Sequence, residues 1–136
     1  MNQEWLLLDT SGLFCALDRS ERRHGRAIEW LISPKRKMVH NYVLAELIAL
    51  ASARGLPMHT VIEFSNALLV NPLVEVVWVD ETLHRAALAL LENRPDKRYS
   101  LCDAVSFVLM RTHSISQALT TDKHFAQEGF VRLLED

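Results

Sequence analysis

The stretch "WLLLDTSGLF" (Trp5–Phe14) places four apolar residues directly before an aspartate, two hydroxyl-bearing residues and a glycine. An uninterrupted apolar run of this length is typical of a strand in a sheet that is covered on both faces. Ligands of open α/β sheets bind beyond the carboxyl ends of the strands. The stretch therefore predicts a buried first strand, Trp5–Leu8, that delivers Asp9 to a binding edge. Gly12 and the hydroxyl groups are expected to form a tight turn into the next helix.

Outward from this stretch, short apolar runs alternate with longer segments of helical periodicity. The further predicted strands are Met38–His40, Val74–Val79, Ala118–Thr120 and Val131–Leu134. Helices are predicted at about 12–18, 21–33, 41–54, 57–70, 81–93, 101–113 and 122–127. Strands that alternate with helices favour an α/β fold, with a mostly parallel sheet of four to five strands and helices on both faces.

Length and composition narrow the class of protein. The 136 residues predict a single domain, 1–136, and the formal net charge of −2 argues against nucleic-acid binding by bulk charge alone. The two cysteines show no CxxC spacing, so neither a zinc site nor a disulfide framework is indicated. We expect a cytoplasmic protein without a membrane segment, because no basic leader and no apolar span is present.

Four acidic residues stand at or near the ends of predicted strands. Asp9 follows the first strand, and Asp122 follows the fourth by two residues in "ALTTDKHF". Glu46 borders the apolar stripe of the helix after the second strand. Asp103 lies in the first turn of helix 101–113, which is apolar almost all round. We predict that these four acids share one site.

Each acid also has a structural explanation, which the sequence leaves open. Glu46 fits a solvated residue at the border of a helix stripe. Ser100 and Asp103 fit a capping box, which would explain both residues without any chemistry, although capping and metal binding are compatible. Asp80, in "VVWVDETL", also follows a strand, but we set it aside because it is explained as the N-cap of helix 81–93.

Together the four acids point to a cation. Carboxylates in one cleft raise each other's pKa unless a cation neutralises them, and oxygen-only ligands suit Mg²⁺ or Mn²⁺. Such a site typically carries out phosphoryl chemistry. Four hydroxyl groups, those of Thr10, Ser11, Ser100 and Thr120, are candidates to orient the carboxylates or ion-bound water. The six histidines are scattered, and we expect them at the surface or in loops.

At these residues the chain resembles a PIN domain, most closely a toxin of the VapC type. The similar segments are "LLLDTSGLFCAL", "VHNYVLAELIALAS", "RPDKRYSLCDAVSFVLM" and "ALTTDKHFAQEGFVRLL", which carry Asp9, Glu46, Asp103, and Thr120 with Asp122. The resemblance covers nearly the whole chain and implies a three-layer α/β/α sandwich. It also implies an endoribonuclease dependent on Mg²⁺ or Mn²⁺, in which these four acids bind the metal and catalyse the reaction.

The resemblance further implies a small cognate antitoxin as partner and a homodimer. Two alternatives stay open: a PIN-domain nuclease of RNA processing without an antitoxin, and a non-catalytic PIN-like binding module. A haloacid-dehalogenase-like phosphatase is disfavoured, because it needs a second aspartate where Ser11 stands. Because RNA is negatively charged, it needs positively charged residues to bind beside an acidic centre. We predict that Arg94, Lys97 and Arg98, just before the Asp103 helix, bind the RNA.

Overall fold

The computed structural model describes residues 4–135, which build one five-stranded sheet around a central first strand. The strands are β1 (Trp5–Leu8), β2 (Arg36–His40), β3 (Val74–Val77), β4 (Gln117–Leu119) and β5 (Val131–Arg132). Their order is β3-β2-β1-β4-β5, and every neighbouring pair is parallel. The expected sheet is thus confirmed, in its five-stranded form and without an antiparallel strand.

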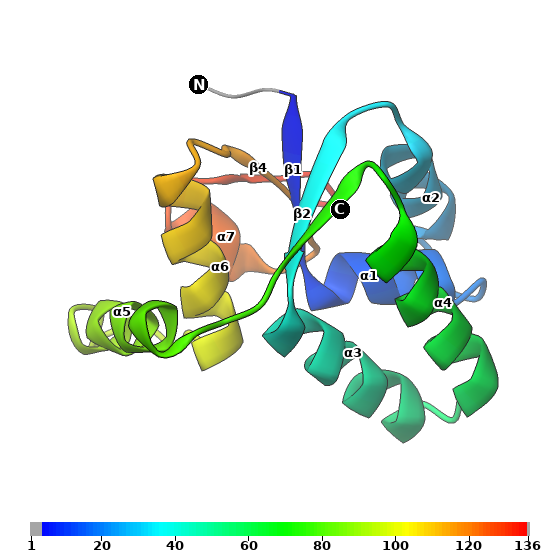
Figure 1. Ribbon diagram of the computed structural model, residues 1–136, viewed down its shortest axis with the longest axis horizontal. Helices are drawn as coiled ribbons and strands as arrows, with labels where there is room; N and C mark the ends of the chain where they lie inside the picture. Colours follow the sequence, from blue (N-terminus) through cyan, green and yellow to red (C-terminus); the bar gives the residue numbers. More distant parts are fainter. Residues whose placement is uncertain (1–3, 136) are drawn as a thin grey trace.

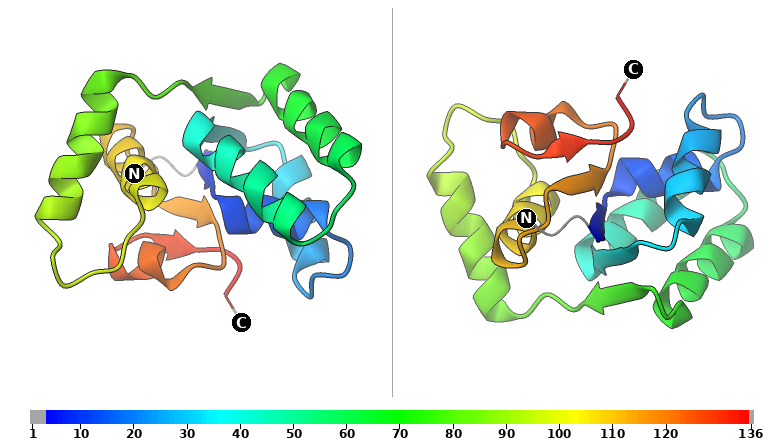
Figure 2. Two further views of the ribbon diagram at one scale, coloured as in Figure 1. Left: turned by 90° about the horizontal axis from the view of Figure 1, so that it is seen from below. Right: turned by 90° about the horizontal axis from the view of Figure 1, so that it is seen from above.

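Helices cover both faces of the sheet, so the molecule has three layers. They are α1 (Thr10–Leu17), α2 (His24–Ile32), α3 (Asn41–Ala53), α4 (Met58–Val70), α5 (Glu81–Glu92), α6 (Leu101–Thr112) and α7 (Lys123–Gln127). Helices α1 to α4 lie on one face and α5 to α7 on the other (Figures 1 and 2). The predicted α/β/α class is confirmed. Among residues 4–135, no helix combines the length and apolar character that crossing a bilayer needs.

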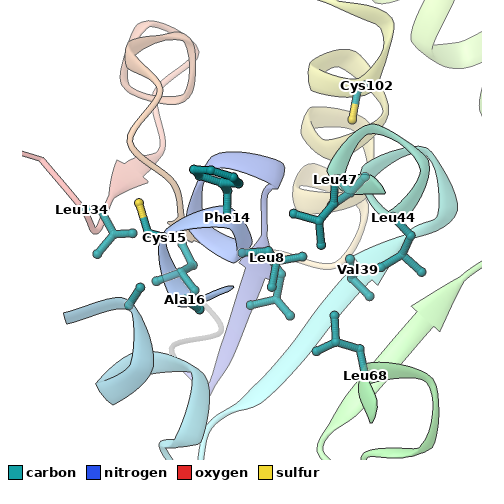
Figure 3. Close-up of a cluster of buried hydrophobic side chains, with 14 residues drawn as sticks. Leu8, Phe14, Cys15, Ala16, Val39, Leu44, Leu47, Leu68, Cys102 and Leu134 are labelled. Carbon is teal, nitrogen blue, oxygen red and sulfur yellow. The ribbon is translucent and has the colours of Figure 1, made fainter. Parts of the chain in front are cut away.

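Successive residues of the central strands feed two separate cores. Leu8 and Val39 belong to the core under α1 to α4, whereas Leu7 and Met38 belong to the core under α5 to α7. This division follows from the alternation of side chains along a strand, and it explains why β1 and the Met38–Val39 pair of β2 are apolar on both faces. Figure 3 shows the first core, to which α6 contributes Cys102.

The first helix begins earlier than predicted, and this changes the role of Gly12. Helix α1 starts at Thr10, directly after Asp9, so Gly12 lies inside the helix and not in a tight turn. A Cβ atom on Gly12 would come within 2.0 Å of the carbonyl oxygen of Leu119 in β4. The missing side chain therefore lets α1 lie directly against the end of β4, and the expected turn was the wrong explanation for this glycine.

A pair of glycine substitutions tests this contact. We expect Gly12→Ala to lower the free energy of unfolding by about 3 kcal/mol, because the new methyl group meets backbone that cannot move aside. Gly25→Ala in α2 is the matched control, since its Cβ meets nothing within 4 Å. It should raise the free energy of unfolding by at most about 1 kcal/mol. Urea unfolding of both variants measures the difference. If Gly12→Ala were as stable as Gly25→Ala, the contact between α1 and β4 would have room for a methyl group at position 12.

Candidate active site

The candidate site lies where the strand order reverses. The chain begins at the central β1, adds β2 and β3 on one side, and returns to place β4 on the other side of β1. Ligands of open parallel sheets bind at such a reversal, beyond the carboxyl ends of the strands. Helices α1, α3 and α6 all begin at this edge, the lower one in Figure 1. Asp9, which directly precedes α1, and the starts of the helices that carry Glu46 and Asp103 therefore lie at one end of the sheet.

Asp9 is held by a hydroxyl pair that joins β1 to the segment after β4. Thr120 Oγ1 and Ser11 Oγ donate to the same Asp9 oxygen, Oδ2, over 2.7 and 3.1 Å. The two hydroxyl oxygens lie 3.1 Å apart. Each hydroxyl also accepts a backbone N–H, Thr120 from Asp122 and Ser11 from Thr121. Asp9 precedes α1, yet its side chain makes no capping bond to that helix, so the carboxylate stays available to the site.

Burial makes the Asp9 carboxylate hard to ionise. The residue is only 4 % exposed, and burial raises its pKa to about 7, with the nearby Asp103 charge raising it further and the Thr120 and Ser11 hydroxyls opposing the shift. A buried acid with a like-charged neighbour is costly unless a cation compensates it. The strand end thus carries a carboxylate that the surrounding protein does not neutralise.

Asp103 serves both as a helix cap and as a member of the acidic site. Its backbone N–H donates to Ser100 Oγ, and its Oδ2 accepts the Ser100 N–H over 3.1 Å, which completes a capping box at the start of α6. The same Oδ2 lies 3.0 Å from Nδ1 of His124. Burial raises the Asp103 pKa, and the bonds from His124 and Ser100 offset part of that rise. The capping explanation is therefore confirmed, and it leaves the carboxylate beside the other acids.

Asp122 and His124 complete a compact group of ligand atoms with Asp103. One atom from each of these three side chains lies within 4.8 Å of the others. Asp122 caps α7 by accepting the backbone N–H of His124, and its Oδ1 lies 3.4 Å from His124 Nδ1. The sequence reasoning placed Asp122 correctly near the strand end but missed His124. The available signal was the Asp-x-His spacing that begins three residues after the end of β4.

The expectation that all histidines lie at the surface or in loops is wrong. His40 ends β2 fully buried, its Nε2 lies 2.9 Å from Ser106 Oγ, and burial lowers its pKa to about 4. His84 bonds to the Tyr42 hydroxyl across α3 and α5. His124 joins the acids. The sequence pattern failed here because the role of an imidazole depends on contacts between segments that are far apart in the chain.

Glu46 lies in α3. Its side chain is exposed, as expected for a residue at the border of the apolar stripe. The charges of Glu46, Asp9 and Asp103 all act on the buried thiol of Cys102, whose pKa rises mainly through burial. The three acids are therefore near one residue of the first turn of α6. Thr10 is buried near the same thiol, and its hydroxyl bonds to none of the acids.

The three basic candidates divide into two environments. Arg94 forms a two-pronged ion pair with the buried carboxylate of Glu128, which also binds Tyr99 and Arg111. This network connects the end of α7 to α6 and to the segment before α6. Arg94 and Glu128 are 34 residues apart, so no local sequence pattern reveals their pairing. Lys97 and Arg98 instead line a surface hollow together with His124, Asp96 and Gln127. The hollow places both residues near His124, which contacts Asp103 and Asp122.

The donor set fits a divalent cation. Asp9 and Asp103 are buried carboxylates with raised pKa values, and within residues 4–135 the basic side chain within 4.0 Å of Asp103 and Asp122 is His124. Carboxylate oxygens are the usual ligands of Mg²⁺ and Mn²⁺. The group of Asp103, Asp122 and His124 could hold such an ion, with Asp9 and Glu46 as the further acidic candidates. The hydroxyls of Ser11 and Thr120, and Ser100 through its cap, fix the acids in place.

Comparison with known proteins gives consistent results at the level of sequence and fold. The PIN domain family model matches residues 6–130. The 23S rRNA-specific endonuclease VapC20, from two strains of Mycobacterium tuberculosis, is 30% identical over 129 residues, which is 94% of this chain and 97% of the relative. The crystal structure of Mycobacterium tuberculosis VapC20, described as a sarcin–ricin loop cleaving toxin, superposes with a TM-score of 0.84 at 29% identity. The superposition covers 96% of this chain and 99% of the VapC20 chain.

Proposed function

This chain belongs to the PIN domain family, and we propose that it is a metal-dependent endoribonuclease that hydrolyses RNA phosphodiester bonds as the toxin of a toxin–antitoxin pair. The observation that carries the proposal is the group of ligand atoms from Asp103, Asp122 and His124 within 4.8 Å of one another, near the buried Asp9, on which the charge of Asp103 acts. The 30% identity with an rRNA endonuclease across 94% of the chain supports the reaction class. We take residues 1–136 as one nuclease domain of cytoplasmic location.

The proposed ion is Mg²⁺ or Mn²⁺, bound by Asp9, Asp103 and Asp122 with Glu46 at the border of the site. When bound, such an ion polarises the phosphate and lowers the pKa of water, which is the chemistry that phosphodiester hydrolysis needs. The protein residues supply the rigidity: Thr120 and Ser11 fix Asp9, and the capping box fixes Asp103. Their bonds limit rotation of the carboxylates, so little reorganisation is needed when substrate binds.

We propose structured ribosomal RNA as the substrate class, because the relative at 30% identity is named a 23S rRNA-specific endonuclease. The test incubates the purified protein with intact ribosomes and with total RNA, in Mg²⁺, in Mn²⁺ and in EDTA. We expect cleavage of 23S RNA at one position, seen as two discrete fragments that require the ion and are absent with EDTA. Cleavage of other RNA only would overturn the substrate class, and no ion-dependent cleavage of either sample would overturn the nuclease.

Lys97 and Arg98 are proposed to guide RNA to the acids, with Arg94 engaged mainly by Glu128. We expect Lys97→Ala and Arg98→Ala each to weaken RNA binding several-fold at low salt. Each should also reduce the slope of log affinity against log salt by about 0.7–0.9, as expected for one lost phosphate contact. A filter-binding titration with a 23S hairpin, in the cleavage-deficient Asp9→Asn background, measures both quantities. Arg85→Ala on α5, where Arg85 pairs with Glu81, is the control and should leave the slope unchanged.

The proposed partners besides RNA are a small antitoxin and a second copy of the chain. The antitoxin is inferred from the similarity to a VapC toxin, and the homodimer from the same resemblance. Co-purification of the chain with the product of an adjacent small gene tests the first. Light scattering of the isolated chain tests the second.

A further inference from the structure

We propose that His124 is itself a ligand of the divalent ion, through Nδ1, and that this nitrogen makes the site prefer Mn²⁺ over Mg²⁺. The inference rests on the proposed metal-dependent function and goes beyond it, since the acids alone would make an all-oxygen site. It names one additional residue and a consequence for the choice of ion.

The spacing of the ligand atoms matches neighbouring positions around one ion. Nδ1 of His124 lies 3.0 Å from Asp103 Oδ2 and 3.4 Å from Asp122 Oδ1. In an octahedral shell with bonds of about 2.1 Å, adjacent ligand atoms are roughly 3 Å apart. The three atoms, one nitrogen and two oxygens, can therefore occupy adjacent positions on a shared ion without a large movement of any side chain.

The three ligand-bearing side chains are held in this arrangement independently of an ion. Asp103 is fixed by the Ser100 N–H, and Asp122 is fixed by bonds at both its backbone and its side chain. The imidazole packs beside the Tyr99 ring, with 5.2 Å between ring centres. At 27 % exposure the His124 side chain remains open to solvent, so an ion can reach it. The imidazole is thus positioned among the ligand atoms and accessible at the same time.

The nitrogen changes which ion the site prefers. Mg²⁺ takes oxygen ligands almost exclusively, whereas Mn²⁺, a first-row transition ion, accepts an imidazole nitrogen beside carboxylates more readily than Mg²⁺ does. Replacing one oxygen position by Nδ1 therefore weakens Mg²⁺ binding relative to Mn²⁺. Mn²⁺ still accepts the carboxylates of Asp103 and Asp122, so the mixed set suits it.

The experiment measures the ion and its ligands directly, apart from cleavage. Pulsed electron paramagnetic resonance of Mn²⁺ bound to the wild-type chain should show coupling to one ¹⁴N nucleus. His124→Ala should abolish that coupling and weaken Mn²⁺ binding about 10- to 100-fold in calorimetry, with Mg²⁺ binding changed less than about threefold. His124→Asp, which restores an oxygen ligand, should bind Mg²⁺ more tightly than wild type does. His84→Ala is the control. In the wild-type chain His84 bonds to Tyr42 and not to the acids, so this variant should retain the coupling.

The outcomes separate this inference from the proposed function. Mn²⁺ that binds and supports RNA cleavage but shows no ¹⁴N coupling would overturn the role of His124 and leave the nuclease intact. Equal loss of Mn²⁺ and Mg²⁺ affinity in His124→Ala would also overturn it, since that result indicates only positioning of the carboxylates. No binding of either ion, together with no cleavage, would overturn the metal-dependent function itself.

Discussion

Replacing Asp9 with asparagine is expected to abolish ion-dependent RNA cleavage and, at the same time, to stabilise the ion-free protein. Asparagine keeps the shape of the side chain and an oxygen that can accept the Thr120 and Ser11 hydroxyls. It removes the charge that would bind the ion, so we expect cleavage to fall by at least about 10³-fold. Initial rates of 23S cleavage in saturating Mn²⁺ measure this loss.

The gain in stability follows from the pKa of Asp9. Its folded-state pKa of about 7 lies above the ordinary value of 3.8, so the folded state binds the proton more tightly than the unfolded state. Ionisation therefore destabilises the ion-free fold progressively as the pH rises from about 4 to 7. Asp9→Asn lacks this effect, and its advantage should grow from near zero at pH 4 to at most about 4 kcal/mol at pH 8.

Urea unfolding in EDTA at pH 5 and pH 8 checks the prediction, and Asp18→Asn at the far end of α1 is a suitable control. Asp18 is bound by Ser20 at the surface, and its substitution should leave cleavage unchanged and give no gain at pH 8. Adding Mn²⁺ should stabilise the wild-type chain more than Asp9→Asn. A variant that is less stable than wild type at pH 8 would show that Asp9 has a structural role instead.

The sequence predicted those features that depend on neighbouring residues. Asp9 and Asp122 could be located because strand ends are visible as apolar runs, and a parallel sheet brings such ends to one edge. The capping box of Ser100 and Asp103 was also visible, because its two residues are three apart. The predicted start of α1 was two residues too late. Glycine is unfavourable inside a helix, so Gly12 was taken as part of a turn, although the contact with β4 requires it within this helix.

Features that depend on distant contacts could not be predicted. Gly12 is required by the carbonyl of Leu119, a residue 107 positions later. The buried charge of Glu128 is explained by Arg94 and Arg111, which precede it on other elements. His124 acquires its role because the turn of chain after β4 places its ring against Asp103 on α6. In each case the residue type is ordinary, and only the fold gives it a partner.

Replacing Asp103 with asparagine is expected to separate its two roles. The amide oxygen of the introduced side chain can still accept the Ser100 N–H, and the backbone bond to Ser100 Oγ does not involve the side chain, so the capping box survives. The charge is lost, so cleavage should fall by at least about 10³-fold while the free energy of unfolding changes by less than about 1 kcal/mol. Cleavage rates and urea unfolding of the same preparations give both values.

Two matched variants complete the comparison. Ser100→Ala removes the cap but keeps the charge, and should cost about 1 kcal/mol of stability with less than about a tenfold loss of cleavage. Asp80→Asn alters the acidic N-cap of α5, which bonds to Leu83, and should leave cleavage unchanged. If Asp103→Asn still cleaved RNA, Asp103 would be a cap alone. The remaining acids would then have to bind the ion without a carboxylate from α6.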